Sequence, residues 1–252
     1  MTSCGEHTSC TVDSEQQSPV TSAPDTQAQE VVTSVPIGHE KAEDYGKVIA
    51  LTFDDGPNTS TTGEVLDVLE KYGVRATFFL IGDNITEQSS ENIKRAYQMG
   101  CEIANHSKTH SYMNKMSEED IKAEIEFTND KIKEVIGITP KFFRPPYIAV
   151  NKTMYDSIDL TFICGYGCDD YDAKVNADYR YEKTIEQACD GAVILLHDSA
   201  GNFQTVQALE RIIPELLDQG YEFVTCSELF FAKGVPVDPD DTNMYSLVQK
   251  QG

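Results

Sequence analysis

The chain has 252 residues and a mass of 28.0 kDa, and its 20 Lys+Arg against 42 Asp+Glu leave a net charge of −22. This length suits one domain of α/β-barrel size or two small domains, and 40% apolar residues are enough to bury a core. The negative charge argues against nucleic acid and against an anionic membrane face as partners, because both would repel it. No apolar run in the sequence reaches the length of about 18 residues that a membrane-spanning helix needs.

The first part of the chain has the composition of a linker. Residues 1–44 contain no Phe, Tyr or Trp, and 12 of the 44 are Ser or Thr, so residues 1–45 are predicted to be a disordered linker ahead of a folded domain at 46–252. Thr2-Ser3-Cys4-Gly5 resembles the end of a bacterial lipoprotein signal, although an arbitrary start would look the same. We therefore expect an extracellular or cell-surface protein, anchored by a lipid on Cys4.

The cysteines do not form a recognisable framework. There are seven, an odd number, at scattered positions, and no pair has C-x-x-C spacing. Neither a disulfide scaffold nor a cysteine zinc site is therefore predicted. Cys164 and Cys168 lie among apolar residues, which favours a place in the core.

From Lys47 onward, short apolar segments typical of buried strands alternate with amphipathic segments typical of helices. The first strand ends at Asp54-Asp55-Gly56-Pro57, a strong turn signal, and Ser117 is predicted to cap a long helix. Strands are predicted at 48–53, 76–81, 101–104, 142–143, 160–163, 192–196 and 221–225. Helices are predicted at 64–72, from the second strand to Gly100, after Ser117, at 181–189, and at 204–218 with a bend at Pro214.

This alternation predicts an α/β fold in which parallel strands are covered by helices. Seven strands favour a barrel-like (β/α) fold over a short open sheet. The active site of such a fold lies at the C-terminal ends of the strands. The most unusual polar clusters of the chain follow strands in this way, at 54–55, 105–110, 144–147, 169–171 and 197–198.

His106 and His110 are four residues apart, and with a carboxylate from another strand they would form a metal site with open positions. Such a set suits Zn²⁺ in a hydrolase, and it equally suits non-haem Fe²⁺ in an oxygenase. A histidine pair of this spacing is, by itself, more often a helix cap or a surface feature. Because Asp54 and Asp55 are predicted at the same rim, we favour the metal site.

The remaining polar residues suggest acid–base chemistry. Of Asp54 and Asp55, one carboxylate could bind the ion while the other serves as a base, although Asp-Gly-Pro is also ordinary turn chemistry. Arg144 could keep that base ionised, or be a plain ion pair on an acidic protein. His197 could be a core histidine, or an imidazolium held by Asp170 that acts as a general acid.

Five segments, in this order, resemble the motifs of the polysaccharide deacetylases, the NodB-homology group of carbohydrate esterase family 4. They are Thr52-Phe53-Asp54-Asp55-Gly56-Pro57, Asn105-His106-Ser107-Lys108-Thr109-His110, Arg144-Pro145-Pro146-Tyr147, Asp170-Tyr171 and Leu195-Leu196-His197. The resemblance covers residue 46 to about residue 235. It implies a distorted barrel with a divalent metal at its mouth, most often zinc, with cobalt or nickel in some members.

The resemblance also implies a role for each matching residue. Asp55, His106 and His110 would bind the metal, Asp54 would be the catalytic base, and Arg144 would orient it. His197 would be the general acid, supported by Asp170, with the adjacent Asp169 as the alternative partner. Substrate would contact Tyr147, whose N–H would hold the oxyanion, together with Pro146, Tyr171 and Leu195, the last beside the acetyl methyl group.

The fourth motif departs from the family pattern, because Tyr171 stands where Trp is usual and the chain has no Trp. The segments at 165–172 and 227–239 resemble a clostridial branch that includes acetylxylan esterases. We expect a monomeric hydrolase that removes acetyl groups from an extracellular polysaccharide, with N-acetylglucosamine polymers (peptidoglycan or chitin oligomers) preferred and acetylated xylan as the alternative. A non-catalytic sugar-binding protein and an Fe²⁺ oxygenase are the alternatives from other classes.

Overall fold

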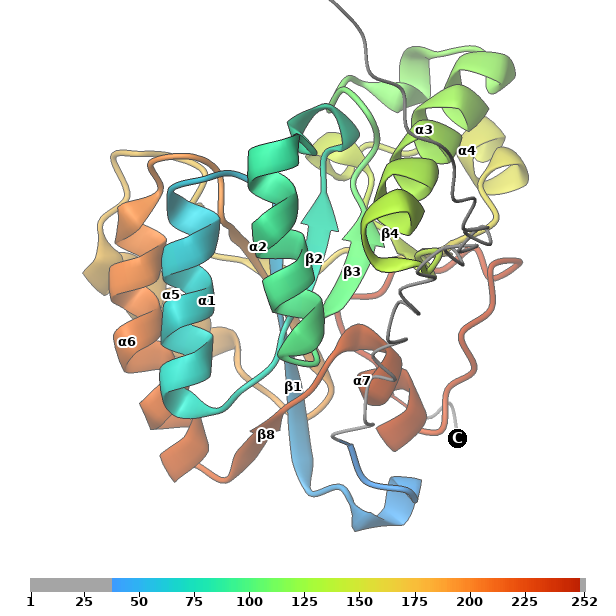
Figure 1. The fold of residues 1–252 in the computed structure, drawn as a ribbon. Coiled ribbons are helices and arrows are strands. Elements are labelled where there is room, and N and C mark those ends of the chain that lie inside the picture. The colour runs from blue at the N-terminus through green and yellow to red at the C-terminus, as the bar shows by residue number, and fades with distance from the viewer. Residues whose placement is uncertain (1–37, 250–252) are drawn as a thin grey trace, which may run out of the picture. The chain divides into compact units, whose positions relative to one another are not determined.

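The computed structural model describes residues 38–249 (Figure 1). The predicted lipid anchor at Cys4 and the predicted linker up to residue 37 lie outside the described residues. The last residues of that linker prediction are described, and they include a short 3-10 helix at Ala42–Asp44. His39 Nε2 lies 2.9 Å from a carboxylate oxygen of Glu222, so this segment contacts the rest of the fold.

Within the described residues, eight parallel strands form one sheet in the order β5-β4-β3-β2-β1-β7-β6, and β8 pairs with the start of β1. The seven predicted strands are all present, and the short strand β6 beside β7 was not predicted. The bounds are β1 (Lys47–Asp54), β2 (Thr77–Leu80), β3 (Glu102–Asn105), β4 (Phe142–Phe143), β5 (Thr161–Phe162), β6 (Tyr166–Gly167), β7 (Ala192–His197) and β8 (Tyr221–Phe223).

The end of the described chain bridges the two sides of the curled sheet. Tyr245 makes a bridge to Ile163, directly after β5, and Leu247 makes a bridge to Ala192 in β7. Because β5 lies at one end of the strand order and β7 near the other, these bridges bring the sheet close to a barrel. This agrees with the predicted distorted (β/α)7-type fold.

Helices follow most strands, as predicted, but their bounds differ in places. The predicted helix at 181–189 begins earlier because Asn176 caps it, accepting a hydrogen bond from Tyr179 N–H. Ser117 caps α3 as predicted, α6 continues through Pro214, and the short helices α4 and α7 were not predicted. The bounds are α1 (Thr61–Tyr72), α2 (Glu87–Gln98), α3 (Glu118–Ile136), α4 (Lys152–Ser157), α5 (Ala177–Gln187), α6 (Phe203–Asp218) and α7 (Cys226–Ala232).

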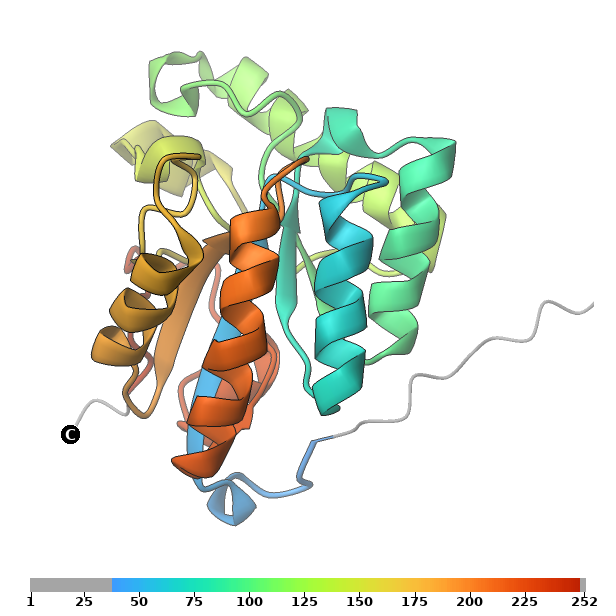
Figure 2. The same cartoon turned by 90° about the vertical axis from the view of Figure 1, so that its left-hand side faces the viewer.

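Helices cover one face of the sheet, which we call the outer face. The other, inner face is covered at one end only. Helices α1, α2 and α6 stand side by side along the outer face (Figure 2). Leu51 of β1 points into that outer core, while Ala50 belongs to an inner cluster completed by Leu229 and Phe230 of α7. Helix α7 therefore fills the end of the inner face where β1 begins, and the opposite end remains for the polar residues.

The cysteines fit the sequence interpretation as far as they are described. Cys101, Cys164, Cys168, Cys189 and Cys226 are all free thiols, and Cys168 is buried while Cys164 is partly buried. None of the helices in residues 38–249 is both long and apolar enough to cross a membrane.

Candidate active site and metal centre

The candidate base and acid lie on the inner face because side chains alternate along a strand. On β1, Ala50 is an inner core residue, and the same face reaches Asp54 four residues later. On β7, Val193 is an inner core residue, and the same face reaches His197 four residues later. The parallel register pairs Asp54 with His197, so both side chains end at the same level of the sheet.

The same alternation places two further functional residues. Ala104 of β3 and Phe142 of β4 both belong to the inner cluster, and His106 and Arg144 follow each of them by two positions. The main-chain N–H of Arg144 donates to the carbonyl of Asn105 at 3.0 Å, which continues the pairing of these strands beyond their formal ends. Four strands thus deliver their polar side chains to one rim.

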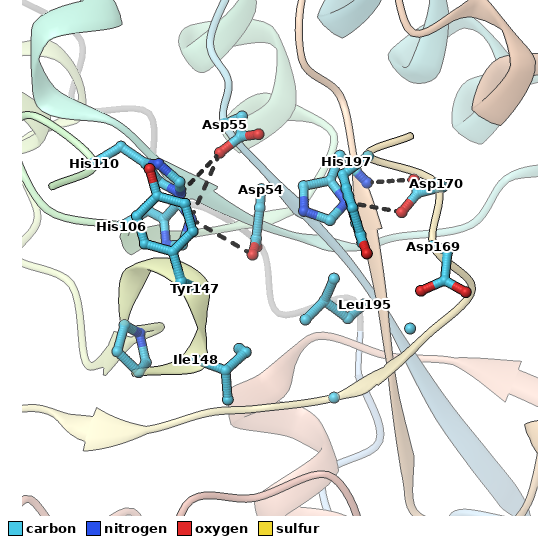
Figure 3. Close-up of a pocket in the computed structure, with 14 residues that line it drawn as sticks. Asp54, Asp55, His106, His110, Tyr147, Ile148, Asp169, Asp170, Leu195 and His197 are labelled. Atoms are coloured by element: carbon cyan, nitrogen blue, oxygen red, sulfur yellow. Dashed lines mark hydrogen bonds and ion pairs between the residues drawn. The ribbon is translucent and has the colours of Figure 1, made fainter. Parts of the chain in front are cut away.

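Asp55, His106 and His110 form the predicted metal-binding group (Figure 3). Each offers a ligand atom, and these atoms lie within 4.8 Å of one another. Asp55 Oδ1 lies 3.6 Å from His106 Nε2 and 3.5 Å from His110 Nε2. This oxygen is buried and has no hydrogen-bond partner in the described part of the chain, as expected of an atom that coordinates an ion.

The tautomer of His106 also fits a metal ligand. Its Nδ1 lies 2.7 Å from the main-chain carbonyl of Arg144, and a carbonyl can only accept a hydrogen bond. Nδ1 therefore carries the proton, and Nε2 presents its lone pair toward Asp55. One carboxylate and two imidazoles, with positions left open, are a donor set that suits Zn²⁺ and related divalent cations.

The loops that carry these ligands adopt left-handed backbone conformations. The φ angles are 76° at Asp55, 69° at Ser107 and 56° at His110, which are costly for residues other than glycine. Side chains hold both turns in place. Asn84 Nδ2 donates to the carbonyl of Asp55 at 2.8 Å, and Ser107 Oγ accepts from the N–H of His110 at 3.0 Å.

Asp54 is buried against Arg144. A guanidinium nitrogen of Arg144 donates to Asp54 Oδ1 at 2.5 Å, and another donates to Thr52 Oγ1 at 2.8 Å. Burial by itself would raise the pKa of Asp54, but the charges of Arg144, His106 and His197 outweigh it and hold this pKa below its usual value. Asp54 is therefore ionised at neutral pH, with Oδ2 free to face the cavity.

His197 is held by Asp170, not by Asp169. Asp170 accepts from His197 Nδ1 and from the main-chain N–H of His197, both at 2.7 Å, and from Thr205 Oγ1 at 2.8 Å. Burial would lower the pKa of His197, but the hydrogen bond and the charge of Asp170 raise it to about 9. The imidazole is therefore protonated at neutral pH, as a general acid requires.

These side chains line one open cavity of about 610 Å³. The Leu195 side chain forms part of its floor, and Gly165 approaches so closely that an added Cβ would lie 2.8 Å from Leu195 Cβ. Pro145 lines the cavity instead of the predicted Pro146, which is buried behind it in a 3-10 turn. The lining residues are Asp54, Asp55, His106, His110, Pro145, Tyr147, Ile148, Gly165, Gly167, Asp169, Asp170, Tyr171, Leu195 and His197.

Two tyrosines stand on opposite walls of this cavity. Tyr147 is 54% exposed, has a left-handed φ of 59°, packs 4.6 Å from the ring of His110 and stacks on Tyr112 at 4.1 Å. Tyr171 is 70% exposed, and its ring lies 6.0 Å from that of His197. Tyr171 therefore presents its ring to the cavity beside His197.

Sequence reasoning missed several residues of the site. Ile148, Gly165 and Gly167 line the cavity, but they come from short segments without a periodic pattern. Asp169, the alternative partner of His197, has a left-handed φ of 56° and an exposed side chain that lines the cavity, while Asp170 makes the hydrogen bonds to His197. Thr205, which supports Asp170, lies on α6, and no local signal links it to the site.

Comparison with known proteins agrees with this geometry. The sequence profile of the family described as "Polysaccharide deacetylase" matches residues 41–162. The chain is 38% identical over 193 residues to a peptidoglycan-N-acetylglucosamine deacetylase of Bacillus cereus, and this match covers 73% of the chain and 88% of the relative. The chain belongs to the polysaccharide deacetylase family.

Other polysaccharide deacetylases are more similar. A bifunctional xylanase/deacetylase of Pseudobutyrivibrio xylanivorans is 53% identical over 189 residues, which cover 75% of this chain and 31% of that protein. Among solved structures, a family 4 acetyl xylan esterase from Clostridium thermocellum, in complex with a cobalt ion, is 43% identical with a TM-score of 0.79, covering 80% of this chain and 99% of that one. The Xyl-CE4 domain of a multidomain xylanase from the hindgut metagenome of Trinervitermes trinervoides is 51% identical with a TM-score of 0.78, covering 80% and 97%.

The similar proteins are named as deacetylases and esterases, and one of the solved structures holds a cobalt ion. The chain spans less than a third of the xylanase/deacetylase and 40% of a similar peptidoglycan deacetylase of Listeria monocytogenes.

Proposed function

We propose that this protein is an acetylxylan esterase, which removes O-acetyl groups from xylan. The observation that carries the proposal is the order of the similarities. Relatives named for xylan or xylanase are 43–53% identical, while the peptidoglycan deacetylases are 30–38% identical. This reverses the order expected from the sequence, which preferred N-acetylglucosamine polymers.

The negative charge of the chain also favours xylan over peptidoglycan as the substrate. The net charge is −22, and Asp54, Asp55, Asp169 and Asp170 all line the cavity. An acetylated xylose backbone carries no charge, whereas the peptide stems of peptidoglycan carry carboxylates that this surface would repel. N-Deacetylation of N-acetylglucosamine units in peptidoglycan or chitin oligomers is the second candidate, supported by the similarity to the deacetylases of Bacillus and Listeria.

Each polar residue of the cavity has a proposed task. Asp55, His106 and His110 would hold a divalent cation, Zn²⁺ first and Co²⁺ or Ni²⁺ as alternatives, which would act as a Lewis acid on the acetyl carbonyl. Asp54 Oδ2 takes a proton from the attacking water, and Arg144 keeps this carboxylate ionised and oriented.

His197 and Asp170 would supply the general acid of the reaction. His197, held by Asp170, donates the proton of its Nε2 to the departing sugar oxygen. The ester C–O bond breaks, and the products are acetate and a sugar with a free hydroxyl group. The main-chain N–H of Tyr147 would donate to the oxyanion that develops on the carbonyl oxygen. Leu195 would contact the acetyl methyl group, and Tyr171 would contact a sugar ring.

The test is acetate release by the Zn²⁺- or Co²⁺-loaded protein on acetylated xylan, N-acetylglucosamine oligomers and peptidoglycan, side by side. The chelated protein and the Asp54→Asn variant are the controls. We expect release from xylan that both controls abolish. Release from the glucosamine substrates alone would replace the proposal with N-deacetylation, and metal binding without any release would leave a sugar-binding protein.

A polysaccharide substrate supports a place of action outside the cell, and we propose that the protein is extracellular or at the cell surface. A monomer is the proposed state. Western blotting of cell fractions and sedimentation of the purified protein test these two points.

A further inference from the structure

A buried carboxylate outside the cavity contacts the turn between the two histidine ligands. Glu124, on α3, has only 8% of its surface exposed. Its Oε2 accepts the main-chain N–H groups of Lys108 and Thr109 at 2.9 and 2.8 Å. Its Oε1 accepts Thr109 Oγ1 at 3.0 Å. Both carboxylate oxygens of Glu124 thus accept hydrogen bonds from the two residues before His110.

This turn has an unfavourable backbone conformation. Ser107 and His110 both have positive φ, and the N–H groups between them have no strand or helix partner. Glu124 is the buried partner here, and because a buried acceptor left without donors costs about 1–3 kcal/mol, its carboxylate is stabilised by these two N–H groups as they are by it. A charged acceptor is the stronger kind, and Glu124 supplies it to two neighbouring N–H groups at once.

The other side of the turn is held independently. The main-chain N–H groups of Gly82 and Asp83 donate to the carbonyls of Ser107 and Lys108 at 2.9 and 3.0 Å. The segment after β2 therefore fixes the carbonyls, and Glu124 fixes the N–H groups. Loss of Glu124 would leave the N–H groups of Lys108 and Thr109 without their acceptor, and on that side of the turn only the hydrogen bond from the N–H of His110 to Ser107 Oγ would remain.

We propose that Glu124 is a positioning residue for the metal centre, which sets the separation of His106 and His110 without touching the ion. The inference rests on the proposed role of these two histidines as ligands. Because a metal site tolerates ligand displacements of only about 0.2 Å, a relaxed turn weakens binding before it unfolds the protein. Residues that orient ligands in this way typically change metal affinity by about 10–100-fold when mutated.

The experiment compares Glu124→Ala, Glu124→Gln and a matched control, Glu102→Ala. Glu102 is also an acceptor, for the N–H of Ser227 at 2.8 Å and the hydroxyl of Ser227 at 2.5 Å, but it lies at the start of β3, the end away from His106. Zn²⁺ affinity is measured by competition with a chromophoric chelator, and thermal unfolding of the metal-free proteins is measured by circular dichroism.

We expect Glu124→Ala to bind Zn²⁺ at least tenfold more weakly than wild type. Glu124→Gln should stay within about threefold, because its amide oxygen can accept both N–H groups while its NH₂ faces Thr109 Oγ1. Glu102→Ala should lower the unfolding temperature and leave the affinity unchanged. If Glu124→Ala does not fold, Glu124→Asp, which withdraws the carboxylate by one methylene, is compared with Glu124→Gln and should bind at least tenfold more weakly.

Affinity within twofold of wild type in a folded Glu124→Ala, or in Glu124→Asp where the alanine variant does not fold, would overturn the inference. So would equal losses of affinity in Glu124→Ala and Glu102→Ala, since these would reflect general destabilisation. A wild-type protein that binds no Zn²⁺ would instead refute the ligand set itself.

Discussion

The hydrogen bond between Asp170 and His197 predicts how kcat/KM depends on pH. Asp170 raises the pKa of His197 to about 9 through a 2.7 Å hydrogen bond and its charge, against burial, which lowers it. In Asp170→Asn, a nearly isosteric change, this support is lost, and the pKa of His197 should fall to the ordinary 6.5 or below.

The size of the effect follows from the fraction of protonated imidazole. At pH 8, wild-type His197 would be about 90% protonated and the variant about 3%, a loss of about 30-fold in the reactive form. At pH 6, about three quarters of the variant would be protonated. Asp54 stays ionised at both values because its pKa is lowered. The variant should therefore recover most of its kcat/KM, relative to wild type, on acidification.

The assay is kcat/KM for acetate release between pH 5.5 and 9.5, with both proteins loaded with the same metal to the same occupancy. The alkaline limb should lie near pH 9 for wild type and at or below about 6.5 for Asp170→Asn. An unchanged alkaline limb with a uniformly lower rate would refute the reasoning, because Asp170 would then act on geometry alone.

Three further predictions test other parts of the site. Asp54→Asn should retain bound metal, measured by atomic absorption, and lose about 10²–10⁴-fold in kcat, and an unchanged kcat would exclude Asp54 as the base. His110→Ala should lower metal content after dialysis, and full occupancy would remove His110 from the ligand set. Gly56→Ala should cost about 1–3 kcal/mol of unfolding free energy in urea titrations, because the added Cβ would lie 2.5 Å from the buried carboxyl of Asp198, and an unaltered midpoint would show that this carboxyl can move.

Local pattern determined much of what was predicted correctly. Apolar runs marked the long strands, and parallel strands send their C-terminal ends to one edge, so residues following different strands were expected to meet there. The two-residue period then carries each functional side chain to the inner face, as Val193, Leu195 and His197 illustrate on β7. Motif order added the roles, because composition and spacing left Zn²⁺ and Fe²⁺ chemistry equally open.

The short elements escaped prediction for a physical reason. Strand β6 has only two residues, and it exists because Tyr166 and Gly167 lie against β7, which no local pattern records. Helices α4 and α7 are likewise too short to show a clear period, and they are stabilised by tertiary packing.

The tertiary structure also decides which of two neighbouring residues takes a given role. Asp169 and Asp170 are chemically identical and adjacent, and the fold leaves the Asp169 side chain exposed at the cavity while the buried Asp170 carboxylate reaches His197. Glu124 reaches its turn only because α3 packs beside β3. The sequence by itself determined which polar residues follow each strand and at which edge of the sheet they meet, because both depend on short-range patterns in the chain. Which carboxylate supports which partner was decided by contacts between segments far apart in the chain, because only the folded backbone sets those distances.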